Sequence, residues 1–520
     1  MDEILGLFQG LMTGFGIAFS LTNLTFALIG ALLGTVVGIL PGLGPSATIS
    51  LLLPISFKIG SPVTSIIMMA GIFYGAMYGG STTSILVNIP GEAASVVTCI
   101  DGYQMALKGR AGPALGIAAI GSFIAGTIGI IGLTFVAPPL AEFALKFGPP
   151  EYFALTLLGL LMATLLGEGS IIKGLIMVVL GLLLGAVGLD PISGAIRFTW
   201  GFFMLQEGID FVTLAMGMFG IGEILINLEK ELTTELVTKK VTNLWPTLKD
   251  WAEAKWSIVR GSLIGFFIGI LPGGGAVISS LVSYAVEKRC SKHPEEFGKG
   301  AIQGVAGPES ANNSAASASF IPLLTLGIPG NAAIAMIFAA LLIQGVQPGP
   351  FLITEHPDVF WGVVASMYIG NVMLLILNLP LVGMWVQLLR VPYAILAPII
   401  VLFCCIGVYS IRNTVFDIWI MGIFGVIGYI FRKVDLDPGP LILAFVLGRI
   451  LEPALRQALL MSAGSPLIFF RRPISGTLMG FLLLFILIQI VVTLRKKWKR
   501  YSRRSTGQAM RRTFRDRDWA

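Results

Sequence analysis

The heptapeptide GILPGLG, residues 38–44, closes an apolar stretch that begins near Thr25, and GILPGGG, residues 269–275, stands in the same setting later in the chain. Proline removes a helical hydrogen-bond donor, and glycine adopts backbone conformations that other residues avoid. Each heptapeptide therefore predicts a break in an apolar helix. A single break is most simply a kink or a surface loop, but backbone broken at membrane depth must be covered by protein or line a water-filled cavity.

The composition predicts a membrane protein built from helices. Of the 520 residues, 55% are hydrophobic and 12% are charged, whereas a soluble domain carries about 25% charged residues. The mean hydropathy is +0.87. The apolar runs lack the alternation of a barrel strand, so the spans are helical. We expect an all-α polytopic membrane protein with about 10–13 membrane segments, among them the runs 152–166, 171–189, 359–377 and 474–494.

The charged residues and the cysteines indicate the nature of the two chain ends and argue against a disulfide or metal framework. Residues 495–520 form a basic tail directly after the last apolar run, which is typical of a cytoplasmic terminus and suits contact with anionic membrane lipid. The tail needs no nucleic acid to explain it. The N-terminal MDEILGLFQG lacks the basic region of a cleaved signal peptide. The four cysteines show neither a disulfide framework nor metal-ligand spacing, so no structural metal is expected.

The chain repeats itself in order. GILPGLG matches GILPGGG, VNIPGEAA at 87–94 matches LGIPGNAA at 326–333, and GLDP at 188–191 resembles DLDP at 435–438. This succession predicts a duplication. We divide the chain into an N-terminal repeat half, a polar linker, a C-terminal repeat half, an extra transmembrane helix and a basic cytoplasmic tail, at residues 1–228, 229–257, 258–465, 466–494 and 495–520.

Basic residues indicate how the two halves are oriented. The loop after the first Ile-Pro-Gly carries Lys108 and Arg110, but its counterpart at 344–358 has no lysine or arginine. Conversely, EKRCSKHPEEFGKG at 287–300 is basic, whereas its counterpart in the first half is FKIGSP. Because basic loops favour the cytoplasm, equivalent loops are expected on opposite sides of the membrane. This predicts inverted-topology repeats with broken or re-entrant helices, a pattern found in secondary transporters.

Each half places a polar cluster before its Ile-Pro-Gly. Small and hydroxylated residues in membrane helices most often serve close packing, but two adjacent amides cannot both point into one helix interface, and buried amides need partners. Together with the breaks, these clusters are the candidate substrate-binding residues: Pro41, Gly42, Gly44, Ser46, Gly80, Ser81, Thr82, Thr83, Asn88, Pro90, Gly91, Pro272, Gly273, Gly274, Gly275, Asn312, Asn313, Ser314, Pro329 and Gly330.

The chemistry of these groups suits an anion together with a cation. Helices that start after a Pro-Gly turn direct free N–H groups and a positive dipole end at an anion. No lysine or arginine lies between Lys58 and Lys108 or between Lys299 and Arg390, so an anion held there would be bound by dipoles and hydrogen bonds rather than by a fixed ammonium group. The candidates for coupling to a cation are Thr83, Glu92, Glu309, Asn312 and Asn313.

The carboxylates admit two interpretations. An ionisable residue within the membrane is a functional candidate by default. For Glu92 and Glu309, coupling and simple helix capping remain equal alternatives, whereas Glu151, Asp190 and Asp437 flank prolines and are interpreted as caps. No nucleotide-binding, zinc-protease or nucleophile-elbow motif is present, so we expect no enzyme and no cofactor.

With these residues in place, the chain resembles TctA, the large membrane subunit of tripartite tricarboxylate transporters. The resemblance covers about residues 1–500. It is most specific in GTVVGILPGLGPSATISLLLPISF, YGGSTTSILVNIPGEAASVVTCIDGYQMALKGRAGPALGIAAIGSF, and GFFIGILPGGGAVISSLVSYAVEKR followed by GVAGPESANNSAA. It implies kinship with the ion-transporter superfamily and elevator-type movement. It also implies that Gly80–Thr83 and Ala311–Ser314, as polar tips, line the substrate and cation sites.

The resemblance further implies a secondary active symporter in the bacterial inner membrane, multi-pass, with a cytoplasmic C-terminus. The cargo would be a tricarboxylate or another small carboxylate, driven by Na⁺ or H⁺. The implied partners are a small membrane subunit like TctB and a periplasmic solute-binding protein like TctC. A passive anion channel and a carrier for a non-carboxylate solute are the alternatives. The sequence leaves the oligomeric state open, with a homodimer as one option.

Overall fold

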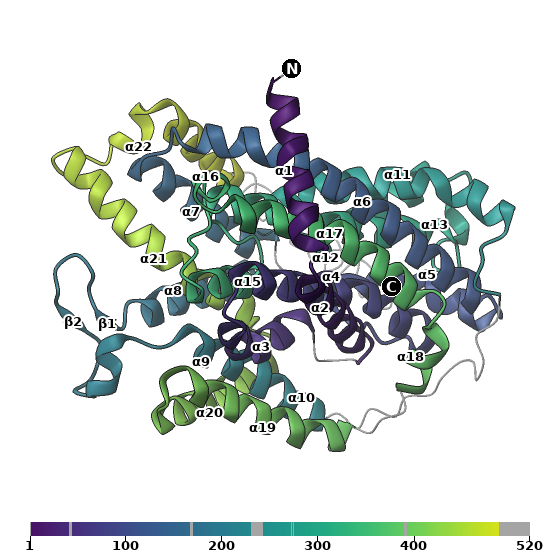
Figure 1. The fold of residues 1–520 in the computed structure, drawn as a ribbon, viewed down its shortest axis with the longest axis horizontal. Coiled ribbons are helices and arrows are strands. Elements are labelled where there is room, and N and C mark those ends of the chain that lie inside the picture. The colour runs from purple at the N-terminus through teal and green to yellow at the C-terminus, as the bar shows by residue number, and fades with distance from the viewer. Residues whose placement is uncertain are drawn as a thin grey trace, which may run out of the picture. The chain divides into compact units, whose positions relative to one another are not determined.

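The structure is a computed structural model that describes residues 2–40, 44–166, 170–229, 243–271, 273, 275–388 and 393–487. It is almost wholly helical (Figure 1). Within the described residues the only strands are β1 (Gly188–Leu189) and β2 (Ile196–Arg197), which form one short antiparallel pair. The prediction of an all-α protein is confirmed.

The first half of the chain is a succession of apolar helices interrupted at the expected breaks. The basic tail and residues 230–242 of the linker lie outside the described residues, as do Pro41, Gly42, Pro272 and Gly274 among the candidate site residues. The elements are α1 (Asp2–Ala18), α2 (Leu21–Ile39), α3 (Pro45–Ile59), α4 (Pro62–Val87), the 3-10 turn η1 (Ala93–Ser95), α5 (Val96–Leu107), α6 (Ala111–Ala144), α7 (Pro149–Leu166), α8 (Ile171–Gly185), the strands β1 and β2, η2 (Phe203–Glu207), α9 (Phe211–Ala215), the π-helical η3 (Met216–Ile221) and α10 (Gly222–Glu229).

The second half follows the same succession: long helix, break, shorter helix, buried helix, break, helix. Its first helix begins at Leu248 behind a capping box formed by Thr247 and Asp250, so the predicted boundary between residues 257 and 258 falls inside a helix. The elements are α11 (Leu248–Ile270), α12 (Gly275–Cys290), η4 (Pro294–Glu296), α13 (Gln303–Ala318), α14 (Phe320–Leu326), α15 (Ala332–Ile343), α16 (Leu352–Glu355), α17 (Pro357–Asn378), α18 (Val382–Leu388), α19 (Tyr393–Arg412), α20 (Val415–Lys433), α21 (Pro438–Met461) and α22 (Ile468–Arg471).

Many of these helices are suited to a bilayer. Among the described residues, seven helices are long and apolar enough to cross a membrane, and shorter apolar helices, such as Pro45–Ile59, Ala332–Ile343 and Pro473–Leu487, lie between and after them. The last of these falls in the predicted extra transmembrane segment. The seven are Leu21–Ile39, Pro62–Val87, Ala111–Ala144, Phe211–Glu229, Pro357–Asn378, Val415–Lys433 and Pro438–Met461.

Two compact units make up the chain, and each is described by itself. The smaller comprises residues 147–158 and the described part of 451–520. Inside it, Arg472 pairs with the buried Glu151 at 2.7 Å, and the Phe153 ring packs against Phe469. The larger unit comprises Met1–Lys146 and Gly159–Ile450 and contains both sets of helix breaks.

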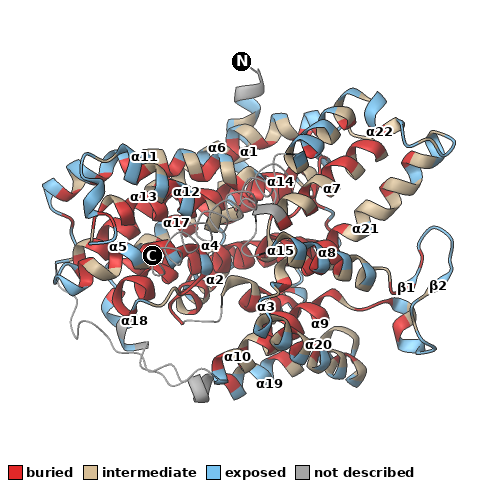
Figure 2. Cartoon of the chain, turned by 180° about the vertical axis from the view of Figure 1, so that it is seen from behind, coloured by how far each residue is buried: buried red, intermediate tan, exposed pale blue. Residues whose placement is uncertain are grey.

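Three helices at the centre of the larger unit are buried almost throughout, namely α4, α13 and α15 (Figure 2). A helix that is covered on all sides has no need of an apolar stripe and can carry polar side chains, provided that they find partners. Around this centre, α6, α11 and α13 lie side by side (Figure 1).

Glycine sets the distance between the paired helices of each half. In α2, Gly30, Gly34 and Gly38 recur every fourth residue, and a Cβ atom built on each would lie 2.3–2.5 Å from a backbone oxygen of α4. In α11, Gly261, Gly265 and Gly269 have the same spacing, and their Cβ atoms would lie 2.2–2.6 Å from backbone oxygens of α13. Small residues at this spacing let two helix backbones touch in a membrane. In each half, glycines of one long helix, α2 or α11, therefore lie directly against the backbone of a buried helix, α4 or α13.

We predict that Gly34→Ala and Gly265→Ala each lower the stability of the protein by about 1–3 kcal/mol, because the added methyl group forces two backbones apart. The measurement is the melting temperature of the detergent-solubilised protein. Gly16→Ala in α1 is the matched control, since nothing lies within 4 Å of its Cβ position. Equal melting temperatures for all three variants would contradict the close-packing account.

Candidate functional site

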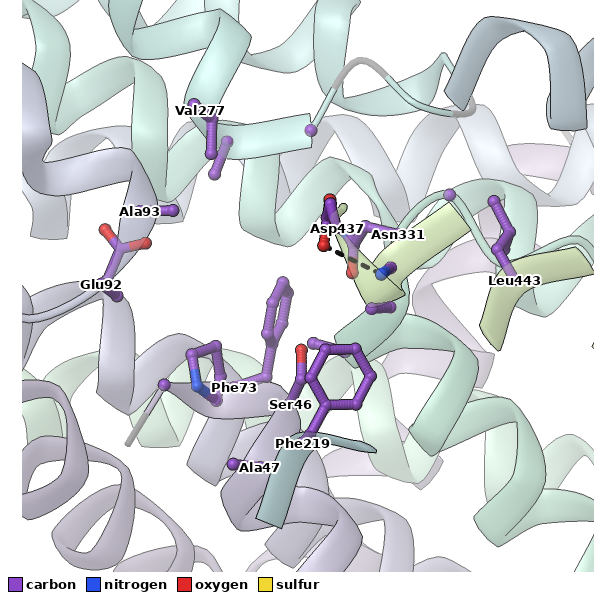
Figure 3. Close-up of a pocket in the computed structure, with 18 of the residues that line it drawn as sticks. Ser46, Ala47, Phe73, Glu92, Ala93, Phe219, Val277, Asn331, Asp437 and Leu443 are labelled. Carbon is purple, nitrogen blue, oxygen red and sulfur yellow. Dashed lines mark hydrogen bonds between the residues drawn. The ribbon is translucent and has the colours of Figure 1, made fainter. Parts of the chain in front are cut away.

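One cavity gathers the helix starts that follow the breaks (Figure 3). Its volume is about 580 Å³. Four helices of more than two turns begin at its wall: α3 at Pro45–Ala47, α12 at Gly275–Ile278, α15 at Ala332–Ala333 and α21 at Gly439–Pro440. Because the first turn of a helix carries a partial positive charge, the cavity receives four positive dipole ends. The first turn of α21 offers few free N–H groups, since Pro438 and Pro440 have none and the Gly439 N–H donates to Asp437.

The two Ile-Pro-Gly turns have the same construction. The preceding helix ends on a residue in the left-handed conformation, Asn88 at φ 59° and Gly327 at φ 67°. The next helical segment is then capped by the residue after the turn. Glu92 accepts a hydrogen bond from the Ala94 N–H at 2.7 Å, and Asn331 accepts one from the Ile334 N–H at 2.9 Å. Capping by Glu92, which was one of its two predicted roles, is thus present in the structure.

The breaks of the second half are joined directly, since the Gly273 N–H donates to the Gly330 carbonyl at 2.8 Å. In the first half, Gly91 packs against α2 so closely that a Cβ atom there would lie 1.8 Å from the Gly38 oxygen. The Ile-Pro-Gly turn of the first half is therefore held against the end of α2, and that of the second half against the break that follows α11. Of the candidate residues, those that line the cavity are Gly44, Ser46, Pro90, Gly91, Gly273, Gly275 and Gly330, together with Glu92.

The two polar clusters lie inside helices and not at helix ends. Gly80–Thr83 sits inside α4, which continues to Val87, and Asn312–Ser314 sits inside α13, which continues to Ala318. The expectation of polar tips is therefore wrong for these residues. Their helices remain continuous because they are enclosed by other helices, so packing stabilises the helical backbone despite its polar side chains.

The clusters instead face each other across the two halves. The carboxylate of Glu309, which is 1% exposed, accepts hydrogen bonds from the Ser81 hydroxyl at 2.6 Å and from the Thr98 hydroxyl. The amide of Asn312 donates to Glu92 at 3.2 Å. Residues far apart in the sequence thus form one buried polar group, which we call the central cluster: Ser81, Glu92, Thr98, Glu309 and Asn312.

Charge in the central cluster is not balanced by a basic side chain. Among the described residues, no lysine, arginine or histidine forms an ion pair with Glu92 or Glu309. Side-chain oxygens on α13 add to the excess of acceptors, since Asn312 Oδ1 and Asn313 Oδ1 are buried without a hydrogen-bond partner. A buried carboxylate without a counter-charge must take up a proton or hold a cation.

Glu92 connects the cluster to the cavity, because it belongs to both. The other candidates hold the helices in place. Thr83 donates to the Ile39 carbonyl at 2.9 Å, Asn313 donates to the Ser122 hydroxyl at 2.7 Å, and Ser314 donates to the Ser262 carbonyl at 2.7 Å. Thr82, Asn88 and Pro329 do not line the cavity.

Sequence reasoning missed part of the cavity wall. Arg432 in the last turn of α20 lines the cavity and pairs with Glu223 of α10. A fixed positive charge is therefore present where we expected only dipoles and hydrogen bonds. Asp437 also lines the cavity and accepts from the Gly439 N–H at 2.9 Å, which confirms it as a cap. Aromatic walls come from Phe73 and Phe219 (Figure 3).

The family model described as "Tripartite tricarboxylate transporter TctA family" matches residues 24–443. An uncharacterised 52.8 kDa protein of Agrobacterium vitis, described as lying in the TAR-I ttuC' 3' region, is 52% identical over 447 residues, covering 86% of this chain and 89% of that protein. A second uncharacterised A. vitis protein, from the TAR-II ttuC' 3' region, is 51% identical over 233 residues, covering 45% of this chain and 96% of its own length. No solved structure matches the chain.

We predict that Ser81→Ala destabilises the protein by about 1–3 kcal/mol, because a buried carboxylate loses one of its two hydroxyl donors. Ser319→Ala is the matched control, since that buried hydroxyl donates only within its own helical turn, to Ala316 at 2.7 Å. The measurement is thermal unfolding in detergent. The role assigned to Ser81 fails if both variants lose the same stability.

Proposed function

Because the chain belongs to the TctA family of tripartite tricarboxylate transporters, a family of membrane transporters, we propose that it is the permease subunit that carries a small carboxylate through the bilayer by cation symport. The observation that carries this proposal is the convergence of four helix starts on one cavity. A citrate-like acid presents two or three carboxylates, and unpaired N–H groups at helix starts are ready-made donors for carboxylate oxygens.

The central cluster is the proposed site of coupling. Glu309 and Glu92 are acceptors without basic partners, and oxygens of Asn312 and Asn313 lie on the same helix as Glu309. Protonation of a carboxylate, or a Na⁺ ion held by such oxygens, would neutralise the cluster. Since Glu92 faces the cavity, its charge acts directly on an anion held there. Loading of the cation therefore favours loading of the anion, which is the energetic requirement for symport.

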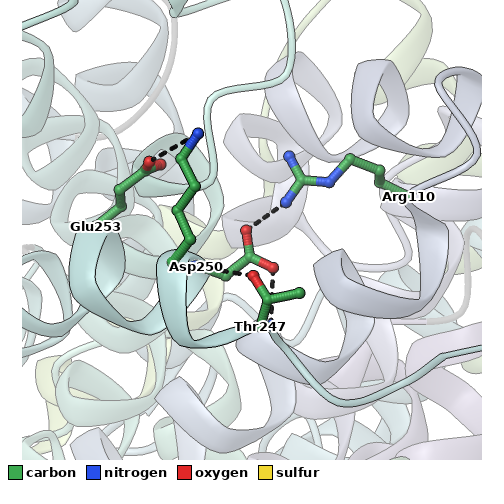
Figure 4. Close-up of polar contacts among 5 residues, drawn as sticks. Arg110, Thr247, Asp250 and Glu253 are labelled. Atoms are coloured by element: carbon green, nitrogen blue, oxygen red, sulfur yellow. Dashed lines mark hydrogen bonds and ion pairs between the residues drawn. The ribbon is translucent and has the colours of Figure 1, made fainter.

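Contacts between loops support inverted repeats. The basic loop at 108–110 meets the basic loop at 287–300 of the other half: Lys108 donates to the Lys299 carbonyl, and Arg110 pairs with Asp250 at the start of α11 (Figure 4). On the non-basic side, Gln344 of the second half donates to the carbonyl of Ser56, which lies in α3 directly before FKIGSP, at 2.6 Å. The basic region of one half thus lies near the basic region of the other, and the non-basic regions likewise, which is the pairing expected if the two halves have opposite orientation.

Asp101 anchors the basic pair of loops. Its buried carboxylate accepts backbone N–H groups of Gly298 at 2.9 Å, Gly300 at 2.7 Å and Ala301 at 2.9 Å. We place this face in the cytoplasm of a bacterial cell, in the inner membrane, with a TctB-like small subunit and a TctC-like periplasmic binding protein as partners. An elevator-type movement of one part of the chain against another would carry the cavity from one side to the other.

The orientation of the halves is tested by cysteine labelling. Lys58 and Cys290 lie in the last turns of α3 and α12, which hold equivalent places in the two halves, and both are exposed. We expect a membrane-impermeant maleimide to label wild-type Cys290 in inside-out vesicles but not in spheroplasts. We expect the reverse for the double variant Cys290→Ser, Lys58→Cys, because its cysteine faces the periplasm. Cys290→Ser alone measures background from the other thiols. Labelling of both positions from one side rules out inverted repeats.

The coupling role is tested by Glu309→Gln, which keeps the size of the side chain and removes its charge. In proteoliposomes that contain the complete transporter, we expect gradient-driven uptake of radiolabelled citrate to fall to the level of empty liposomes, while citrate exchange persists. Glu253→Gln is the control, because Glu253 lies near the surface and contacts only Lys249 among the described ion pairs (Figure 4).

Two outcomes of this experiment are decisive. Gradient-driven uptake by Glu309→Gln at the wild-type rate would remove Glu309 from the coupling site. Wild-type uptake that is indifferent to both proton and sodium gradients would reject symport and favour a passive channel.

A further inference from the structure

The ionisable side chains that line the cavity are mostly acidic. Glu92, Glu223 and Asp437 contribute carboxylates, and Arg432 is the one basic residue among the described lining residues. Helix starts offset part of this negative charge, at about half a unit of positive charge each. A multiply charged anion would still meet three carboxylates in a partly enclosed site. An arginine at this wall is therefore the strongest local attraction that the cavity offers to such an anion.

The position of Arg432 leaves its guanidinium partly available. Its side chain is 29% exposed, so it reaches the cavity instead of being sealed in the protein. Glu223, whose side chain is 13% exposed, pairs with Arg432 through the Nη1 atom, and the Nε atom of Arg432 is buried without a hydrogen-bond partner, so the exposed part of the guanidinium is what a cargo could reach. A guanidinium carries five N–H donors in a fork that matches a carboxylate. Glu223 does not use all of them.

We propose that Arg432 is the binding residue for one carboxylate of the cargo and that Glu223 is an internal carboxylate that holds Arg432 when the cavity is empty. This inference rests on the proposed function, because it requires an anionic cargo. The remaining carboxylates of the cargo would face the starts of α3, α12 and α15. Binding then exchanges one carboxylate for another at the same guanidinium, or lets both share it.

This arrangement solves a problem of release. A buried arginine without a partner would hold a carboxylate tightly, and it would also be costly to bury in the empty carrier. Glu223 removes both difficulties, because it pairs with Arg432 in the empty state and competes with the cargo in the loaded state. The affinity of the cavity is then set by the difference between two similar ion pairs.

A purely structural role for the pair is the alternative outcome. Arg432 lies in the last turn of α20, where a cation interacts favourably with the helix dipole, and its partner lies on the neighbouring helix α10. In that role, removing either charge weakens the same contact. Both variants would then lose stability together, and neither would alter the concentration of citrate needed for half-maximal uptake.

The experiment measures KM and maximal rate of citrate uptake by the complete transporter in proteoliposomes, with succinate as a second substrate. Arg432→Gln should raise the KM for citrate roughly tenfold or more, as expected for loss of a hydrogen bond to a charged group. Glu223→Gln should lower the KM several-fold, because the internal competitor is gone. Arg432→Lys, which keeps the charge but loses the fork, should lie between wild type and Arg432→Gln.

Opposite shifts of KM in Arg432→Gln and Glu223→Gln support the inference. Parallel shifts, or unchanged KM values with less folded protein, overturn it and leave a structural ion pair. If Arg432→Gln does not reach the membrane, the KM values of Arg432→Lys and Glu223→Gln still show whether removing the two charges shifts KM in opposite directions. Should the wild-type protein take up neither citrate nor succinate, the proposed function itself fails, whereas normal wild-type uptake with unshifted variants rejects only the role of Arg432.

Discussion

Contact between helix backbones through glycine is the constraint on which the site depends. In each half, three glycines spaced by four residues bring α2 or α11 against the carbonyl oxygens of the buried helix α4 or α13, with no room for a Cβ atom. The same glycine-bearing helices, α2 and α11, end at the two heptapeptides that break the chain. Close packing therefore fixes where each break occurs in space. Wider spacing would displace the starts of α3 and α12 from the cavity that they line.

The central helices are surrounded by other helices and not by lipid, so they can carry polar side chains. The buried helices α4 and α13 contribute Ser81 and Glu309 to one contact between the halves, and this contact is satisfied by hydroxyl groups instead of an opposite charge. Hydroxyls stabilise a carboxylate less than a guanidinium does, so the charge of Glu309 remains sensitive to a proton or a cation. Glu287, by contrast, is a buried carboxylate that does pair with a guanidinium, that of Arg260.

The sequence was informative wherever a local pattern carried the structure. Proline and glycine act on their own backbone, so the breaks and the cap at Asp437 could be predicted, and motif matches gave the family that the comparison confirms. The placement of Gly80–Thr83 at a helix tip was wrong because enclosure by other helices, a tertiary effect, keeps α4 continuous. The glycines at every fourth position in 30–38 and 261–269 can be read from the sequence, but glycine is common in membrane helices, so the spacing alone did not identify these contacts. Arg432 could not be found, because only the packing of α20 beside α10 brings it to the cavity.

Cargo and coupling cation are linked by electrostatics if the cavity and the central cluster act together. Glu92 caps a helical segment at the cavity wall and also contacts Asn312 of the cluster, so its charge lies between the two sites. An anionic cargo is repelled by an ionised Glu92 and draws on the same kind of N–H donors that Glu92 uses. Neutralising the cluster removes this repulsion, and an anion in the cavity in turn favours the neutral cluster. Coupling then needs no direct contact between cargo and cation, only one carboxylate that belongs to both sites.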